Sequence, residues 1–359
     1  MGGALRIGGE PLVRLTAGDV PATGPAFVEA TVLPGRGMML LQARLRLASG
    51  EVVDALAAPE PHVAARALDG GPDDFAGDAS FSFGGAILTP YANRIRGRAL
   101  DGAREIETRI AGRTVRLPRN WGGKAKGAEQ YAMHGLILDA AIPWRQEAPD
   151  RVRGRLDAGD FAGRWPGRAV LTFEWRLDSG ALALRVTAES VGQTPLPIGF
   201  GWHPYFALPS KDRRQARLWM PAASRALVNN YDEALPTGAI QPVANSPYDF
   251  TAPGGQPLGD LYLDDCFTDL QRRDGEAVAE IRDPASSLGL RIASRSPQVS
   301  AMQVYAPPDK SFVVIEPQFN LADPYGAEWT GRDTGMASVS PGEAVTYEAR
   351  VTAFALGNR

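Results

Sequence analysis

The most constraining feature of this sequence is a strict alternation of apolar and polar residues on both sides of a tight turn. Residues 169–177 and 181–188 alternate with a period of two, and Asp178-Ser179-Gly180 separates them. A period of two places successive side chains on opposite faces of an extended strand, and a short link with glycine joins two antiparallel strands. The pattern therefore predicts a β-hairpin with one face in a core.

Shorter runs of the same kind occur along the whole chain. Residues 29–56 predict an opening hairpin with a turn at Ser49-Gly50. Further short strands are expected at 217–220, 226–228, 236–240, 263–267, 278–281, 288–292, 299–305 and 345–354. No composition break or fixed repeat interrupts them. The sequence therefore predicts one all-β domain over residues 1–359, with a core at about 30–355, built as a large antiparallel β-sandwich of roughly twenty strands.

Charge and cysteine content exclude several classes of function. The formal net charge is −3 and there is no dense block of Lys or Arg, so nucleic acid is not an expected partner. The single cysteine, Cys266, excludes an internal disulfide framework and a cysteine-rich zinc site. Residues 1–8 lack the apolar run of a secretory signal, and no later run is long enough to span a membrane. We expect a cytoplasmic protein, either monomer or homodimer, without a membrane partner.

One strand pattern leads directly into an acid. Phe312-Val313-Val314-Ile315 favours a buried strand, Glu316 follows it, and Pro317 is expected to end it. Such a strand would deliver the carboxylate of Glu316 to the rim of a sheet. Taken alone, this stretch favours a structural acid held by a nearby Arg or Lys.

Other polar residues in similar settings change that interpretation. Arg94, His134, His203, Asp264 and Glu316 each end or follow an apolar strand, and they are far apart in the sequence. In an antiparallel sandwich such side chains can converge on one concave face, where a small polar ligand could bind. The two histidines and the two acids could in principle bind zinc. However, no two of them have the short spacing that usually begins a zinc site, so the sequence predicts no metal.

The motifs around these residues resemble those of the aldose 1-epimerase (galactose mutarotase) family in order and approximate spacing. They are Asn93-Arg94-Ile95, His134-Gly135, His203-Pro204-Tyr205-Phe206, Asp264 with Phe267, and Glu316-Pro317. The resemblance covers roughly residues 30–355. It implies a galactose mutarotase-like β-supersandwich that interconverts the α and β anomers of a free aldose, an aldohexose or an aldopentose, without a cofactor.

The resemblance also implies a role for each residue. Glu316 would be the general base that takes the proton of the C1 hydroxyl, and His203 the acid that protonates the ring oxygen. His134 would bind and polarise the sugar. The residues that would hold sugar hydroxyls are Asn93, Arg94 and Asp264.

Ring opening needs an acid and a base that are both tuned near neutral pH. Histidine has such a pKa already, whereas burial must raise that of glutamate. We expect Glu316 and His203 to face each other across a gap about one pyranose wide.

The sequence departs from the family pattern at positions near the sugar. These are Thr89-Pro90, Leu136, Ala207-Leu208 and Asp265. They argue against assuming a preference for galactose, and the preferred aldose stays open. Either Asp264 or Asp265 could be the acid that meets the ligand, although the spacing to Phe267 favours Asp264.

Two further functions stay open at this stage. A mutarotase for phosphorylated or sulfonated sugars would need extra cations at the pocket, for which Arg96, Arg98, Lys124 and Lys126 are candidates, although a solvated surface explains them equally well. A non-catalytic sugar-binding protein of the same fold would not need both an acid and a base.

Three aromatic residues and the third histidine complete the list of candidates. Trp121, Trp202 and Tyr205 could stack on a sugar, or pack in the core or a lid. His62 matches no motif and is expected to be structural.

Overall fold

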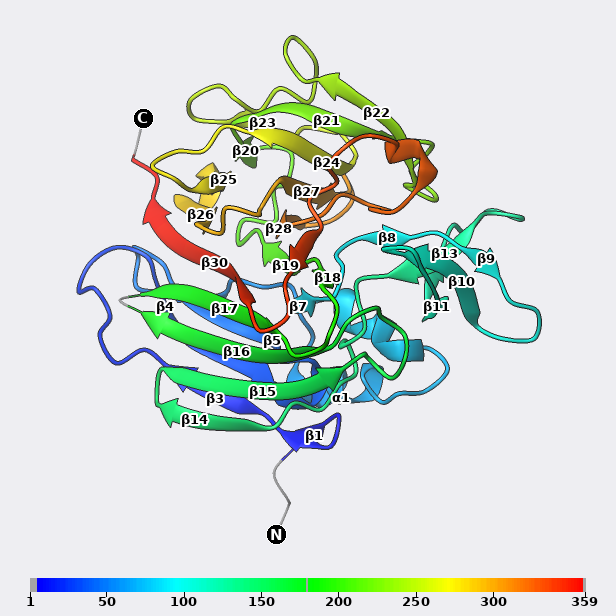
Figure 1. Cartoon of the computed structure of the whole chain (residues 1–359). Coiled ribbons are helices and arrows are strands. Elements are labelled where there is room, and N and C mark those ends of the chain that lie inside the picture. The colour runs from blue at the N-terminus through cyan, green and yellow to red at the C-terminus, as the bar shows by residue number, and fades with distance from the viewer. Residues whose placement is uncertain (1–4, 179, 358–359) are drawn as a thin grey trace.

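The computed structural model describes residues 5–178 and 180–357. Two large antiparallel sheets form the body of the molecule, and Figure 1 shows β16 and β17 of one sheet in front of β4 and β5 of the other. This is the predicted all-β sandwich.

The first sheet has nine strands. In spatial order they are β14 (Trp144–Ala148), β15 (Arg151–Gly159), β16 (Ala169–Asp178), β17 (Ala181–Ser190), β30 (Ala344–Ala355), β26 (Leu288–Ser294), β25 (Ala277–Asp283), β20 (Arg217–Trp219) and β23 (Gln256–Pro257). The predicted hairpin is confirmed as β16 and β17, which pair from Ala169 with Ser190 to Asp178 with Ala181. Ser179, in its predicted turn, lies outside the described residues.

The second sheet has eleven strands. In order they are β22 (Pro236–Pro242), β21 (Ala222–Val228), β24 (Leu263–Leu270), β27 (Ala301–Ala306), β28 (Phe312–Gln318), β19 (Gly201–Ala207), β7 (Gly85–Leu88), β5 (Met39–Arg46), β4 (Ala26–Leu33) and β3 (Val13–Thr16), with β6 (Val52–Asp54) on β5. The predicted opening hairpin is confirmed as β5 and β6. Strand β3 lies before residue 30, so the sandwich begins earlier than the expected core.

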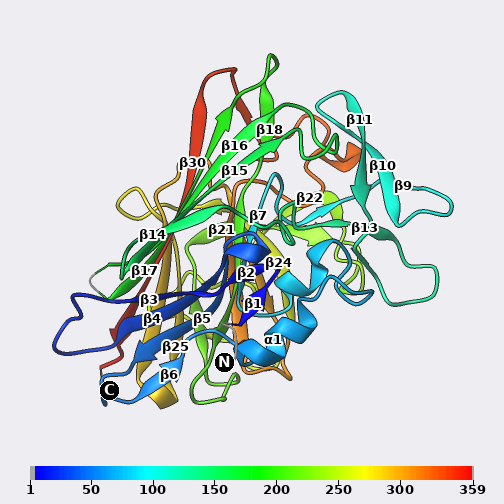
Figure 2. The ribbon, with the colours of Figure 1, turned by 90° about the horizontal axis from the view of Figure 1, so that it is seen from below.

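Four smaller sheets and short helices complete the described chain. The small sheets comprise β1 (Arg6–Ile7) with β2 (Glu10–Pro11), β9 (Arg98–Ala99) with β10 (Glu105–Ile110) and β11 (Arg113–Pro118), β8 (Arg94–Ile95) with β13 (Gln130–Met133) and β12 (Trp121–Gly122), and β18 (Leu196–Ile198) with β29 (Ala337–Val339). The helices are α1 (Pro61–Ala67) and the 3₁₀ turns Pro34–Arg36, Phe75–Phe81, Pro284–Ser286 and Ala327–Trp329. Figures 1 and 2 both show β9 to β11 at one side of the molecule.

The number of strands exceeds the prediction. Thirty strand segments occur in the described part of the chain, against roughly twenty expected. The excess comes largely from two-residue segments such as β8, β9 and β12, which are too short to show a period of two. None of the helices among the described residues has the length and apolar character needed to cross a lipid bilayer.

The main core lies between the two large sheets. Trp175 of β16 and Trp202 of β19 are fully buried, and their rings meet edge to face with centroids 5.5 Å apart. Each indole N–H has a partner, since Trp175 donates to Met38 O at 2.8 Å and Trp202 donates to Gly85 O at 3.2 Å. Buried tryptophans of this kind contribute large apolar areas to the core without leaving a polar group unpaired.

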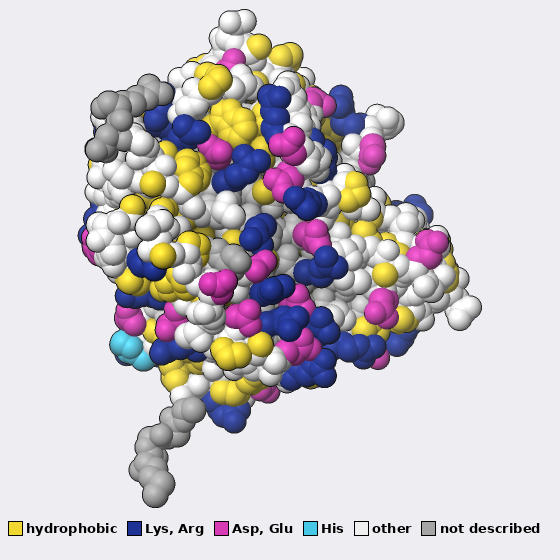
Figure 3. All heavy atoms as spheres, turned by 90° about the vertical axis from the view of Figure 1, so that its left-hand side faces the viewer, with side chains coloured by type: hydrophobic (Ala, Val, Ile, Leu, Met, Phe, Trp, Pro, Cys, Tyr) yellow, Lys and Arg dark blue, Asp and Glu magenta, His cyan; other side chains and the backbone are white. Residues whose placement is uncertain are grey.

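Ion pairs join neighbouring strands of the nine-stranded sheet on its solvated face. Arg153 pairs with Glu174 at 2.7 Å, and Arg185 with Glu348 in the next strands. Figure 3 shows one side of the molecule on which basic and acidic side chains alternate along a band. Because these pairs are exposed, each contributes at most about 1 kcal/mol to stability.

A buried ion pair fixes the segment that leads to β7. Arg36 donates to both carboxylate oxygens of Asp74, at 2.7 and 2.9 Å, and also to Ser80. Ser80 in turn donates to Leu138 O. These bonds hold the 3₁₀ segment that ends at Phe81, whose ring lines the cavity described below.

We expect Arg36→Met to lower the free energy of unfolding by about 3–5 kcal/mol, because the Asp74 side chain, 1% exposed, would stay buried without its partner. Arg44→Met is the matched control. Its pair with Asp54 is 39% and 42% exposed, so the expected loss is about 0–1 kcal/mol. Urea unfolding of both variants measures the difference. Equal losses would contradict a structural role for the Arg36–Asp74 pair.

Candidate active site

The two expected proton-transfer residues lie opposite each other on adjacent strands. Gly201 of β19 pairs with Gln318 of β28, and Tyr205 pairs with Val314, so the register places His203 across from Glu316. Strand alternation sends the neighbouring Trp202 into the core and turns His203 to the other face of the sheet. The same alternation that builds the core therefore presents the imidazole to a cavity.

The expectation that Pro317 ends its strand is wrong. Strand β28 continues through Pro317 to Gln318, in the middle of the eleven-stranded sheet. Pro317 pairs with Met302 of β27, whereas the pairing of β28 with β19 is interrupted between Val314 and Gln318. A central strand tolerates proline where the ladder is interrupted, because no backbone N–H is needed there. The interruption falls where His203 and Glu316 face each other.

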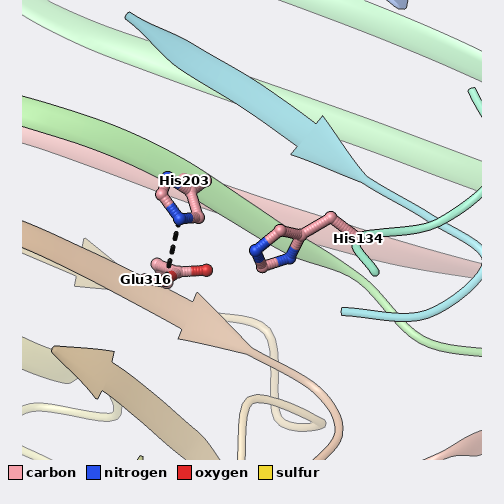
Figure 4. Close-up of side chains that lie close together, drawn as sticks. All are labelled: His134, His203 and Glu316. Atoms are coloured by element: carbon pink, nitrogen blue, oxygen red, sulfur yellow. Dashed lines mark ion pairs between the residues drawn. The ribbon is translucent and has the colours of Figure 1, made fainter. Parts of the chain in front are cut away.

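The acid and the imidazole are closer together than expected. His203 Nε2 lies 3.4 Å from Glu316 Oε1, with both side chains almost fully buried, as Figure 4 shows. The expectation of a gap one pyranose wide is therefore wrong. Gln318 donates to Glu316 Oε2 at 2.8 Å and fixes the carboxyl group. Since O1 and O5 of a pyranose are bonded to the same carbon, two adjacent groups can reach both.

Two tight turns hold the second histidine beside this pair. Asn93 and His134 both have left-handed backbone conformations, with φ of 63° and 64°. His134 N donates to Asn93 O at 2.9 Å, and Asn93 N donates to His134 Nδ1 at 3.3 Å. With Nδ1 accepting, we infer that Nε2 carries the proton. Nε2 of His134 has no hydrogen-bond partner within residues 5–178 and 180–357, so it is a free donor in the cavity.

The remaining candidates form a closed hydrogen-bonded ring. Arg94 donates to Asp264 at 3.0 Å and to Asn93 at 2.7 Å. Gln303 donates to the other oxygen of Asp264 at 2.6 Å and accepts from Asn93 at 3.1 Å. Tyr131 accepts a bond from Arg94 Nε at 3.2 Å. These contacts orient a carboxylate and a guanidinium at the cavity wall and leave little freedom to either.

The structure separates the two aspartates of β24. Asp264 lines the cavity, whereas Asp265 turns to the opposite face of the strand, as alternation requires. Asp265 is fully buried, forms an ion pair with Arg225 and accepts a hydrogen bond from Tyr231 at 2.9 Å. Tyr231 lines the cavity, so Asp265 supports the wall without itself lining the space.

Together these residues enclose a cavity of about 430 Å³, which is large enough for a monosaccharide. All six residues expected at the site line it. Its lining is Phe81, Ser82, Asn93, Arg94, Trp121, Gly122, Lys124, Met133, His134, His203, Tyr205, Tyr231, Asp232, Tyr262, Asp264, Gln303, Tyr305, Lys310, Phe312 and Glu316. Sequence reasoning missed Gln303, Tyr231 and Tyr262 at the wall, together with Gln318 behind Glu316. Period two along β28 could have indicated Gln318, because it shares a face with Glu316.

Two loops from distant parts of the chain meet at the cavity mouth. The carboxylate of Asp232 accepts the backbone N–H groups of Lys124 and Ala125, at 2.8 and 3.0 Å. Glu233 accepts the N–H of Glu129 at 2.6 Å. These bonds lower the pKa of both carboxyl groups below their ordinary values. The ionised carboxylates therefore tie the two loops together at neutral pH.

Of the four basic residues suggested for an anionic sugar, only Lys124 lines the cavity. Arg96 pairs with Glu129 at 2.7 Å and Arg98 with Glu107 at 2.6 Å. Lys126 is exposed and does not line the cavity, whereas Lys124 does. A second lysine at the cavity, Lys310, is one that the sequence did not indicate.

Two of the three aromatic candidates line the cavity, and the third histidine does not. Trp202 belongs to the core, whereas Tyr205 and Trp121 line the cavity, and Trp121 is 38% exposed. His62 lies exposed on α1 and does not line the cavity, in agreement with the structural interpretation.

Burial dominates the electrostatics of the acid and the imidazoles. It raises the pKa of Glu316 well above its ordinary 4.5, against the opposing hydrogen bond from Gln318. It lowers the pKa of His203 to about 3, and that of His134 well below 6.5, with His203 and Arg94 acting in the same direction on His134. The raised glutamate agrees with expectation, but the imidazole does not keep its ordinary pKa. Burial therefore favours the neutral form of both partners.

The same three side chains could also approach a metal ion. Ligating atoms of His134, His203 and Glu316 all lie within 4.8 Å of one another. The sequence did not indicate this cluster, because the three residues come from different strands and turns and no two of them are close in the sequence. Two imidazoles and one carboxylate are a known catalytic zinc ligand set, although zinc at 2.0–2.2 Å from each atom would require them to draw closer.

The fold and the cavity define a β-sandwich protein with a buried acid and imidazole in a sugar-sized pocket. A family model described as aldose 1-epimerase matches residues 53–352, and the chain belongs to this family. No curated protein sequence matches the chain significantly.

Solved structures share the fold at low sequence identity. A GalM/aldose epimerase homologue from Caenorhabditis elegans superposes with a TM-score of 0.72 at 18% identity, covering 96% of this chain and 99% of that one. A galactose mutarotase-like protein from Clostridium acetobutylicum gives 0.71 at 17% identity, with 92% and 93% covered. Galactose 1-epimerase from Lactobacillus acidophilus gives 0.64 at 19% identity, with 96% and 98% covered. The predicted galactose mutarotase-like fold is confirmed.

We expect His134 and His203 to stay neutral at pH 5, because burial disfavours the charged imidazole and lowers both pKa values. An unperturbed imidazole, with a pKa of about 6.5, is mostly protonated at that pH. NMR of imidazole-labelled protein between pH 5 and 8 measures this, with the urea-unfolded chain as reference. If either imidazole titrates near its ordinary pKa, the electrostatic description of the cavity is wrong.

Proposed function

We propose that this protein is a cofactor-independent aldose 1-epimerase that interconverts the anomers of a free aldohexose or aldopentose. The observation that carries the proposal is the pair of Glu316 and His203, 3.4 Å apart at a cavity that fits one sugar ring. Family membership supports the class of reaction. The core continues across both large sheets, which supports a single domain.

The proposed reaction begins with one proton shared within this pair. We infer that Glu316 holds this proton before the reaction starts and that His203 is then neutral, since burial disfavours both charges. Transfer of the proton across the pair produces a carboxylate and an imidazolium at the same time, with no change in net charge. The carboxylate then takes the proton from O1 while the imidazolium protonates O5, and the C1–O5 bond breaks. After rotation about C1–C2 the same steps run backward and close the ring.

The other residues position the sugar in this proposal. The free Nε2–H of His134 would donate to a sugar oxygen and polarise it. The ring formed by Asn93, Arg94 and Asp264 with Gln303 would hold hydroxyl groups through oriented donors and acceptors. Because these side chains already bond to one another, little ordering is required when the sugar binds.

We expect Glu316→Gln to slow enzymatic mutarotation by a factor of roughly 10²–10⁴, since glutamine keeps the size of the side chain but cannot accept the O1 proton. Polarimetry of freshly dissolved α-glucose, α-galactose or xylose measures the rate. Glu51→Gln, in an exposed turn away from the cavity, is the control and should keep the full rate.

Three outcomes would contradict this proposal. Glu316→Gln could retain the full rate, or the protein could bind sugars without accelerating mutarotation, as a non-catalytic binding protein would. Loss of activity with a chelator and recovery with zinc would instead support a metal site at His134, His203 and Glu316. Metal analysis of the purified protein completes that comparison.

A second candidate substrate is a phosphorylated or sulfonated hexose, favoured by Lys124 and Lys310 at the cavity. In that case kcat/KM for glucose 6-phosphate would exceed that for glucose, and the advantage would fall as salt screens the lysines. If the substrate is a free aldose, as we propose first, we expect kcat/KM for glucose 6-phosphate not to exceed that for glucose. NMR exchange rates of the two sugars at low and high ionic strength separate the candidates.

A further inference from the structure

A second hollow adjoins the sugar cavity. It has a volume of about 360 Å³, comparable with the 430 Å³ of the first cavity. Trp121, Gly122 and Lys124 line both spaces, so the two share a wall. A hollow of this size exceeds the space that a phosphate group alone would fill and is similar to that of the monosaccharide cavity. A ligand of two linked sugar units would place one unit in each space if its linkage crossed the exposed ring of Trp121.

The second hollow is basic. Its lining consists of Arg104, Arg119, Asn120, Trp121, Gly122, Lys124 and Gln130, with no carboxylate among the described residues. Arg119 has no ion-pair partner in the described part of the chain, unlike Arg98 and Arg116 nearby, which both lie beside Glu107. A half-buried guanidinium without a counter-ion is an available site for an anion.

The hairpin of β10 and β11 places two of these cations side by side. Arg119 N donates to Arg104 O at 2.8 Å at the base of the hairpin. The guanidinium of Arg104 lies over the ring of Phe75 at 3.7 Å, and it lowers the pKa of Asp78 against the larger effect of burial. Arg104 thus has a competing acid nearby. No acid within residues 5–178 and 180–357 forms an ion pair with Arg119, so we expect an anionic ligand to gain most from contact with this guanidinium.

Trp121 joins the hollow to the acid and imidazole. Its ring is 38% exposed and meets the ring of Phe81 edge to face at 5.2 Å. Phe81 in turn meets His134 at 4.9 Å. A sugar has apolar C–H faces, and an exposed indole offers a broad apolar surface for one of them. A second sugar unit against Trp121 would therefore lie next to a first unit bound at His134.

We propose that the site accepts a reducing disaccharide whose reducing unit occupies the sugar cavity, while its second unit lies against Trp121 with a carboxylate bound by Arg119. The inference rests on the proposed anomerase function. The bound chemical class is an acidic disaccharide with a uronic acid at its non-reducing end. The deep position of Glu316 and His203 assigns the free C1 to the first cavity and leaves the other end of the ligand toward the second hollow.

Two disaccharides that differ only in charge test this inference. Anomerisation of cellobiose and of its counterpart with a glucuronic acid at the non-reducing end is measured by NMR exchange, beside glucose and glucose 6-phosphate. We expect kcat/KM to be at least tenfold higher for the acidic disaccharide than for cellobiose, through a lower KM. The preference should decrease at high salt.

Matched arginine variants localise the effect. We expect Arg119→Gln to raise KM for the acidic disaccharide by about ten- to a hundredfold, which is the loss expected for a charge-assisted hydrogen bond, and to change KM for glucose far less. Arg113→Gln is the control, because Arg113 is an exposed arginine at the start of β11, and Arg119 follows the last residue of that strand. It should leave both KM values unchanged.

Calorimetric binding of the acidic disaccharide to the three proteins decides the inference independently of turnover. If no sugar is anomerised but Arg119→Gln weakens this binding, the proposed reaction fails and the second subsite stands. Suppose instead that glucose is anomerised but kcat/KM is the same for the two disaccharides, or Arg119→Gln and Arg113→Gln have the same effect on KM. The second subsite is then wrong and the proposed reaction stands. A preference for glucose 6-phosphate alone would also overturn the disaccharide proposal.

Discussion

The site depends on one constraint: a carboxyl group and an imidazole face each other within a sheet and are removed from water together. Burial pushes the pKa of Glu316 up and that of His203 down, so neither charge is stable until a ligand or a proton transfer supplies compensation. Their separation of 3.4 Å couples the titration of the two groups, and in the proposed reaction they share one proton. An acid and a base with opposite tasks can thus be generated at the same moment in a site without net change in charge.

The sheet provides this arrangement through register. Alternation along β19 gives Trp202 to the core and His203 to the cavity, and alternation along β24 separates Asp264 from Asp265. The ladder between β19 and β28 is interrupted where the imidazole and the carboxyl group of the site face each other. Loops then supply the groups that strands cannot orient, such as His134 in its left-handed turn.

Much of the fold and of the site could be predicted from the sequence, because the signals were local. Period two identified the hairpin of β16 and β17, and polar residues at the ends of apolar runs indicated residues such as Arg94 and His134. Several features needed the third dimension. The spacing between His203 and Glu316 depends on the register of strands more than a hundred residues apart. Gln303 gave no signal, since an amide inside a strand is informative only when its neighbours in the sheet are known.

The shared strand of Trp202 and His203 limits how this protein can be engineered for heat resistance. The indole of Trp202 fills the sandwich interior, and the next residue, His203, carries the imidazole for which we propose proton transfer. Repacking around Trp175 and Trp202 would therefore rotate or shift the peptide bond between Trp202 and His203. Thermostabilising designs therefore have more freedom in the solvated face of the nine-stranded sheet. There, charge rearrangements are separated from the imidazole by the full thickness of the core.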